Sequence, residues 1–374
     1  MPSLVQDTRL AARIFAKSPG FTAVAVLSIA LGIGANTTIF SVVDGVVLRP
    51  LSYRDPAGLV VLYEKRVQQN RLRNVVSQPD YVDWKARNTV FEGMAGVTGA
   101  GFTLAGDGEP EFLRGAAVAP NFFRMVGIQP QLGRDFADGE DQPGAAPVIL
   151  LSNGFWKRRF GSDPTVVGRT LTLSGQQRTV VGVLPDVPMS IRSTAEIWQP
   201  LILDPKAFRG LHFLQVFARL KPGVSAEKAR AEMVTLAANI ERENPDVNKG
   251  HSINLFHLKD EVVGDVRPAL LTLLGAVGLV LMIACANVAN LLLARAVQRR
   301  RETSIRVALG AAWWQLARQH MIENLLLSFV GGAAGLLIAS WTIGLLHGMT
   351  AVDIPRLQEI GMDNRVLLFT FGLA

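Results

Sequence analysis

The chain has 374 residues, of which 49% are hydrophobic, and a formal net charge of +7 at pH 7. Its basic residues gather beside long apolar stretches and lack the interleaved aromatic residues of a nucleic-acid-binding surface, which excludes nucleic acid as an expected partner. The apolar stretches predict a membrane protein instead.

The first apolar stretch, residues 21–43, is predicted to be a transmembrane helix. A helix rises about 1.5 Å per residue, so roughly 20 apolar residues cross the hydrocarbon core. Arg9, Arg13 and Lys17 precede the stretch, as basic residues also precede a signal peptide. We interpret it as a retained anchor, because it is longer than the apolar part of a signal peptide and no A-x-A-like cleavage site follows it.

Residues 44–267 carry 27 basic and 25 acidic residues and exceed the usual size of one compact domain. Strand–helix–strand patterns at the two ends of this segment, about 50–95 and 205–260, predict one α/β subdomain built from sequence-distant parts. Between them, at about 95–205, short strands alternate with Gly and Pro turns and predict a β-rich insertion.

Helix starts and strands within this segment are predicted from local signals. Ser77 has capping-box spacing to Asp80 ahead of a short helix, and Ser225 is the expected cap of a helix to about Glu243. The second helix carries an apolar stripe, formed by Ala229, Met233, Leu236 and Ile240. Strands are predicted at residues 59–63, 148–151, 170–173, 178–184, 213–220 and 251–258.

Two further apolar stretches, 268–295 and 324–347, flank a basic loop at 296–323. Positions 295–323 hold six arginines and two glutamates, a net charge of +4, and the first twenty residues have a net charge of +2. Because Lys and Arg near the ends of spans stay cytoplasmic, we expect the amino terminus and this loop inside the cell.

The same charge pattern predicts that residues 44–267 and a second loop, 348–365, are extracytoplasmic. The last apolar run, 366–374, is too short to span a bilayer. We expect it to be the start of a fourth helix that the end of the chain truncates.

Residues for catalysis, cofactors or metals are not recognisable in the sequence. The five histidines include no H-x-x-x-H pair, and no phosphate-binding G-x-x-x-x-G-K-[ST] motif occurs, so any ATP must bind to another chain. His251 and His257 could share a strand face, but further ligands at matching spacing are missing, which favours structural roles. Cys285, the only cysteine, is expected to be a packing residue within the membrane.

Small and polar residues within the spans predict helix packing. Gly331 and Gly335 form a G-x-x-x-G face that permits close contact between helices. Asn287 and Asn290 in the second span, with Asn36 in the first, need hydrogen-bond partners away from water. We interpret them as helix-to-helix contacts rather than a substrate path, because no acidic or basic group joins them.

The cytoplasmic loop holds the most specific motif. Glu302 and Arg306 lie four residues apart on one helix face, and Ile305 and Leu309 share an apolar face, which predicts a short amphipathic helix at the membrane surface. From composition alone, a stop-transfer block followed by such a helix is an equal alternative.

The pattern R-x-x-E-x-x-I-R-x-A-x-G-A, from Arg299 to Ala311, resembles the cytoplasmic loop of MacB/FtsX-type ABC transporter permeases. The strings at 17–21, 31–36, 40–43 and 48–50 resemble the duplicated orphan permease branch of that family. Those at 79–84, 161–164 and 221–225 are similar to its external domain. The resemblance covers nearly the whole chain in order.

The resemblance implies a four-span permease in the bacterial inner membrane, so we expect an α-helical transmembrane bundle of which this sequence holds three full spans and a truncated fourth. A large α+β extracytoplasmic domain would be inserted between spans 1 and 2. It also implies export by mechanotransmission, in which an ABC-type ATPase on another chain moves the external domain through the helices. The coupling residues would be Glu302, Ile305, Arg306 and Gly310.

Further partners implied by the resemblance are a second permease half or a homodimer partner, and a periplasmic adaptor protein. The alternative is an FtsX-like regulator, in which the ATPase controls an extracytoplasmic partner without transport. We favour export because the external segment is large and has two parts. The sequence contains no recognisable catalytic or ligand-binding site that would indicate an autonomous membrane enzyme or receptor.

Overall fold

The computed structural model describes residues 13, 15–66, 68, 71–105, 109–186, 191, 194–204, 206–264, 266–308, 313–348, 356 and 359–373. The chain divides into two compact units. The helical unit comprises Met1–Arg49 and Asp265–Ala374, and the sheet unit comprises Pro50–Gly264.

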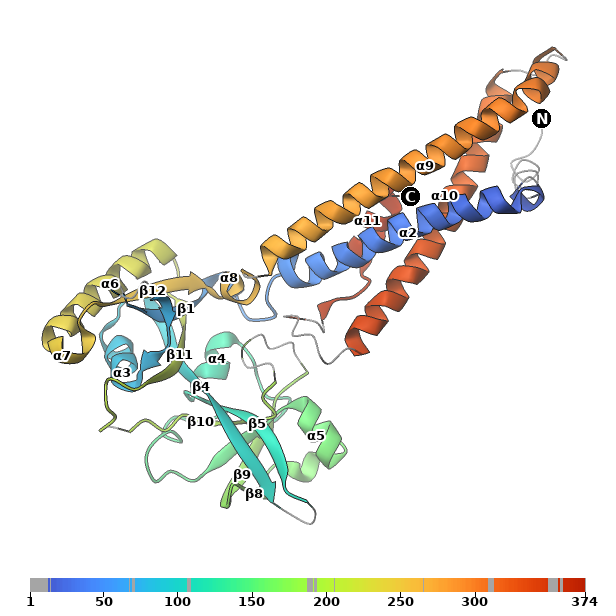
Figure 1. Cartoon of the computed structure of the whole chain (residues 1–374). Coiled ribbons are helices and arrows are strands. Elements are labelled where there is room, and N and C mark those ends of the chain that lie inside the picture. The colour runs from blue at the N-terminus through green and yellow to red at the C-terminus, as the bar shows by residue number, and fades with distance from the viewer. Residues whose placement is uncertain are drawn as a thin grey trace. The chain divides into compact units, whose positions relative to one another are not determined.

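The helical unit contains the predicted membrane-spanning helices (Figure 1). Three segments of the described chain are long and apolar enough to cross a membrane, Pro19–Leu48, Arg267–Val297 and Ala317–Leu346. The helices are α2 (Pro19–Val43), α9 (Arg267–Ala308), α10 (Trp313–Gly348) and α11 (Asn364–Leu373), and a π-helical turn, η1 (Asp44–Leu48), extends α2. The ten-residue α11 occupies the place of the expected fourth helix.

Over its described residues, 299–308, the motif does not form the separate surface helix that its amphipathic pattern suggested. It is instead the end of α9, a single helix of 42 residues (Figure 1). The reason is local, because positions 295–308 contain neither Gly nor Pro, and half of them are Arg or Ala, which favour helix. The next described helix, α10, begins at Trp313 and contains the whole predicted span 324–347.

The described part of the sheet unit is built on twelve strands. Their bounds are β1 (Leu59–Arg66), β2 (Arg71–Asn74), β3 (Val76–Ser77), β4 (Phe91–Ala105), β5 (Glu111–Val118), β6 (Leu132–Gly133), β7 (Val148–Leu151), β8 (Thr170–Leu173), β9 (Gln176–Val183), β10 (Ile197–Pro200), β11 (His212–Leu220) and β12 (His251–His257). The main path runs β12-β1-β11-β4-β5-β10-β7-β9-β6, with β2, β3 and β8 paired beside it.

The long strand β4 links the two predicted parts of this unit. It pairs with β5 along one edge and with β11 and then β8 along the other, so that strands from 50–95, 95–205 and 205–260 belong to one sheet. The boundary between an α/β subdomain and an inserted one stays a prediction.

Short helices cover the sheet. They are α3 (Gln78–Arg87), α4 (Phe122–Val126), α5 (Asn153–Phe160), α6 (Ala226–Glu243), α7 (Pro245–Asn248) and α8 (Leu258–Val263), with 3-10 turns η2 (Pro56–Gly58) and η3 (Pro164–Val166). Both predicted caps are confirmed, because Ser77 accepts the Asp80 N–H and Ser225 accepts the Lys228 N–H.

Strand β1 is buried on both faces. Val60 and Leu62 pack in one cluster with α3 and with the buried stripe of α6, which confirms that predicted stripe. Leu59, Val61 and Tyr63 belong to a second cluster, built around α4 and Trp198. The apolar run at 59–63 therefore forms a central strand, as such runs do when both faces are covered.

The connection between α4 and β7 contains a carboxyl group with an unusual pKa. Burial raises the pKa of Asp135 from 3.8 to about 6, and the hydrogen bond from the Phe136 N–H opposes this only in part. The charged folded state is therefore penalised above pH 6, and the penalty disappears as the pH falls through 6 towards 3.8.

We expect Asp135→Asn to raise the free energy of unfolding of the sheet unit by about 1 kcal/mol at pH 7.5, because the amide keeps the acceptor oxygen without the charge. The gain should vanish near pH 4, where the wild-type carboxyl is protonated. The change in the free energy of unfolding is measured by hydrogen exchange of the β9 amides. Asp138→Asn is the control, since the Asp138 side chain is 85% exposed. An equal gain at both pH values would contradict the explanation.

Candidate functional site

Three of the four predicted coupling residues lie in the last turns of α9. The helix places the backbones of Glu302, Ile305 and Arg306 within two turns of its end at Ala308. Ile305 is 53% exposed. The side chains of Glu302 and Arg306, and the whole of Gly310, lie outside the described residues. The structure thus gives this motif a helical backbone and one exposed apolar side chain.

Gly331 and Gly335 lie where α10 meets α2. A Cβ atom added to Gly335 would be 3.0 Å from the Ala30 carbonyl oxygen, and one added to Gly331 would be 2.5 Å from Cγ2 of Ile29. A Cβ atom added to Gly34 on α2 would likewise be 3.0 Å from the Gly335 carbonyl oxygen. The two helices therefore approach at backbone distance, as small residues permit.

The asparagines of the spans have different surroundings. Asn36 is buried on α2, and its Nδ2 donates to the Gly32 carbonyl at 2.9 Å and to the Val277 carbonyl on α9 at 2.8 Å. Asn287 and Asn290 occupy exposed positions on α9. Among the described residues, Asn36 is thus the asparagine that ties two spans together.

A polar network at the end of α2 was not anticipated from the sequence. Arg49 Nε donates to Asp44 at 2.9 Å, and its Nη2 donates to Asp363 at 2.6 Å. Arg356 pairs with Glu359 and donates to the Arg49 carbonyl at 2.9 Å. The Val366 N–H, together with Arg49, lowers the pKa of Asp363 below its usual range. The network anchors the segment before α11, and the only sequence signal for it was a cluster of charges next to an apolar run.

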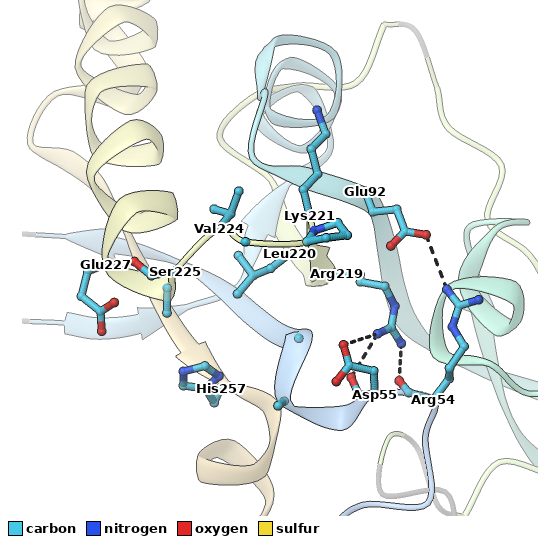
Figure 2. Close-up of a pocket in the computed structure, with 15 residues that line it drawn as sticks. Arg54, Asp55, Glu92, Arg219, Leu220, Lys221, Val224, Ser225, Glu227 and His257 are labelled. Carbon is cyan, nitrogen blue, oxygen red and sulfur yellow. Dashed lines mark hydrogen bonds and ion pairs between the residues drawn. The ribbon is translucent and has the colours of Figure 1, made fainter.

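The sheet unit contains an open pocket of about 640 Å³ (Figure 2). It lies between η2, the end of β11 and the first turn of α6. Both acidic and basic side chains line it, among them Glu92, Glu227, Arg54 and Lys221, so the pocket selects no single sign of charge. Ser225 accepts the Lys228 N–H as the cap of α6.

Arg219, which also lines the pocket, is held by main-chain oxygens. Its Nε donates to the Met125 carbonyl at 2.9 Å, and its Nη1 and Nη2 donate to the carbonyls of Asp55 and Arg54 (Figure 2). Its side chain is only 4% exposed, and burial lowers its pKa. Arg219 therefore fixes the η2 loop and α4 against β11, which is a structural role.

Two family models match the chain. The model of the MacB-like periplasmic core domain matches residues 22–236, and the model of the FtsX-like permease C-terminal region matches residues 274–373. Together they span both units.

Similar proteins include the macrolide export ATP-binding/permease protein MacB 1 of Yersinia pestis, 26% identical over 235 residues, which are 62% of this chain and 35% of that protein. MacB of Escherichia coli K12 is 24% identical over 257 residues, 68% of this chain and 38% of that protein. The chain thus spans just over a third of the length of the curated relatives that it matches. The periplasmic region of MacB from Actinobacillus actinomycetemcomitans is a similar solved structure, with a TM-score of 0.42 and 11% identity, over 60% of this chain and 95% of that one.

Proposed function

Because the chain belongs to the MacB/FtsX-type family of ABC transporter permeases, we propose that it couples ATP hydrolysis on a separate ATPase to export. In this proposal the chain is a non-catalytic permease subunit, and an ABC-type ATPase binds to its cytoplasmic side. ATP binding and hydrolysis then move the extracytoplasmic sheet unit without passage of substrate between the spans.

The observation that carries the proposal is the continuity of α9. The helix begins at Arg267, three positions after the last residue of the sheet unit, and ends at Ala308, two positions beyond Arg306. Forty-two residues give a length of roughly 63 Å, about twice the hydrocarbon thickness. An uninterrupted helix resists bending, so displacement of its cytoplasmic end is carried along its whole length.

We propose that Glu302, Ile305 and Arg306 contact the ATPase, and that Gly310 provides the turn after them. The exposed Ile305 supports this, since an apolar side chain at the end of a basic helix is suited to a protein contact. We further propose a cytoplasmic amino terminus and pairing with a second permease half or a second copy of the chain.

A photoreactive residue at position 305, tested in membranes of the source bacterium, examines the contact with the ATPase. We expect an adduct that mass spectrometry identifies as an ABC-type ATPase. The matched control is position 297, two turns earlier on α9, where Val297 is 73% exposed. It lies at the end of the span Arg267–Val297 and should give no such adduct. Capture of the ATPase from neither position, by a chain that inserts normally, would contradict the proposal.

Export and regulation differ in the extracytoplasmic partner. We prefer export because the sheet unit, Pro50–Gly264, is large. Crosslinking from that unit should capture a periplasmic adaptor if the chain belongs to an exporter. Capture of a cell-wall hydrolase instead would favour the FtsX-like role.

A further inference from the structure

Three side chains with metal-binding atoms meet on neighbouring strands of the sheet unit. Glu64 lies on β1, His212 begins β11 and His251 begins β12. Glu64 Oε2 is 2.7 Å from His212 Nε2 and 3.3 Å from His251 Nδ1, and the three atoms lie within 4.8 Å of one another. The side chains are 2%, 8% and 14% exposed, so the cluster is shielded from bulk water.

The second oxygen of Glu64 has different partners. Oε1 accepts hydrogen bonds from Arg66 Nε at 2.9 Å and Asn74 Nδ2 at 3.0 Å. These donors fix the carboxylate, so that Oε2 alone faces the two imidazole rings. Metal-binding carboxylates are commonly held in this way by hydrogen bonds to the oxygen that the metal does not use.

The orientation of His212 is also fixed. Its Nδ1 is 2.8 Å from the Gly210 carbonyl oxygen, which can only accept, so Nδ1 carries a hydrogen. In the neutral ring, Nε2 then directs a lone pair at Glu64 Oε2. Metal-ligating histidines characteristically donate their other N–H to a backbone carbonyl in this manner.

Two acceptors at 2.7 Å require a proton or a cation between them. A proton on His212 Nε2 satisfies that ring alone. His251 Nδ1 is buried and faces the same oxygen at 3.3 Å without the geometry of a hydrogen bond, and it has no other partner among the described residues. One cation bound at Oε2 satisfies both rings.

A small cavity of about 10 Å³ adjoins the cluster, and Glu64, His251 and Asn248 all line it. A cavity of this size has room for about one water molecule. Asn248 Oδ1 is buried and lacks a hydrogen-bond partner within the described chain, so it can accept from such a water. The site thus offers one carboxylate oxygen, two imidazole nitrogens and room for a fourth ligand.

We propose that Glu64, His212 and His251 bind one divalent transition-metal ion of the Zn²⁺ type. Zinc bonds of about 2.0 Å in tetrahedral geometry separate neighbouring ligands by roughly 3.3 Å. The Glu64–His251 separation already has this value, and His212 must withdraw by roughly 0.6 Å. Since the cavity holds no more than a water, the ion would join β12, β1 and β11 rather than act on a substrate.

The test uses the full chain, purified in detergent with a tag that contains no histidine and stripped of metal with EDTA. We expect one Zn²⁺ per chain in equilibrium dialysis. At a free Zn²⁺ concentration one hundred times Kd, the β1 and β12 amides that exchange through unfolding should exchange about 100-fold more slowly. Co²⁺ in place of Zn²⁺ should give the intense visible bands of a tetrahedral site.

His251→Gln is the decisive variant, because the Nδ1 that it removes makes no hydrogen bond in the described structure and the metal-free fold should persist. We expect it to weaken Zn²⁺ binding about 100-fold. The matched control is His257→Gln on the same strand, which should bind as the wild type does. Absence of tetrahedral Co²⁺ bands in the wild-type chain, or equal Zn²⁺ affinity of both variants, would overturn the proposal.

Discussion

Replacing Gly335 with isoleucine is expected to separate α2 from α10 and to destabilise the helical unit by about 3 kcal/mol or more. An added Cβ would lie 3.0 Å from the Ala30 carbonyl oxygen and 3.1 Å from the Gly34 nitrogen. Both are backbone atoms of α2, so no rotation of a side chain can relieve the contact. The helices must move apart and lose their close packing.

Gly344→Ile is the matched control for this substitution. Gly344 lies on the same helix, and a Cβ there has nothing within 4 Å among the described residues. Both changes carry the same gain in intrinsic helix propensity, so the difference between them isolates the helix contact. The measurement is the temperature at which each detergent-solubilised variant loses its monodisperse size-exclusion peak. Equal temperatures would show that the glycine contact contributes nothing.

Arg219→Met is expected to destabilise the sheet unit by about 3 kcal/mol. The methionine keeps much of the apolar stem but removes the donors to the carbonyls of Met125, Asp55 and Arg54. Buried carbonyls without partners are costly, and they would here release the η2 loop from β11. Hydrogen exchange of the β11 amides, measured in the full chain, reports this loss.

Arg54→Met provides the comparison, because it makes the same chemical change at the same pocket (Figure 2). The Arg54 side chain is 59% exposed and reaches Glu92 at 3.5 Å, a surface ion pair worth little. Its carbonyl, which Arg219 uses, is unaffected by the substitution. If both variants exchange at the same rate, the main-chain contacts of Arg219 do not stabilise the unit.

Features that depend on neighbouring residues were predictable from the sequence. The caps at Ser77 and Ser225 rest on contacts three residues away, and the stripe on α6 rests on helical spacing. Strand β8 has the predicted bounds, Thr170–Leu173, and three helices satisfy the length and composition of a span. Each of these signals lies within one element, so no knowledge of the tertiary fold was needed.

Contacts between distant segments were not predictable. Glu64 and His212 are 148 positions apart, and only the order β12-β1-β11 brings them together with His251. Arg49 and Asp363 are 314 positions apart. The end of α9 escaped prediction for another reason, since an amphipathic pattern without a helix breaker does not reveal whether a new helix begins. The asparagine pattern likewise could not tell the buried Asn36 from the exposed Asn287.

The number of residues in α9 determines which way its last turns face. A helix rotates by about 100° per residue, so one inserted residue turns the face that carries Ile305 by about 100° while lengthening the helix by only about 1.5 Å. Seven residues, close to two full turns, restore the direction to within roughly 20°. The number of residues between Arg267 and Ile305 therefore sets the direction in which the proposed coupling face points. Under the proposed coupling role, inserting or deleting about seven residues should preserve the direction of this face, whereas a change of one residue should turn it away from its partner.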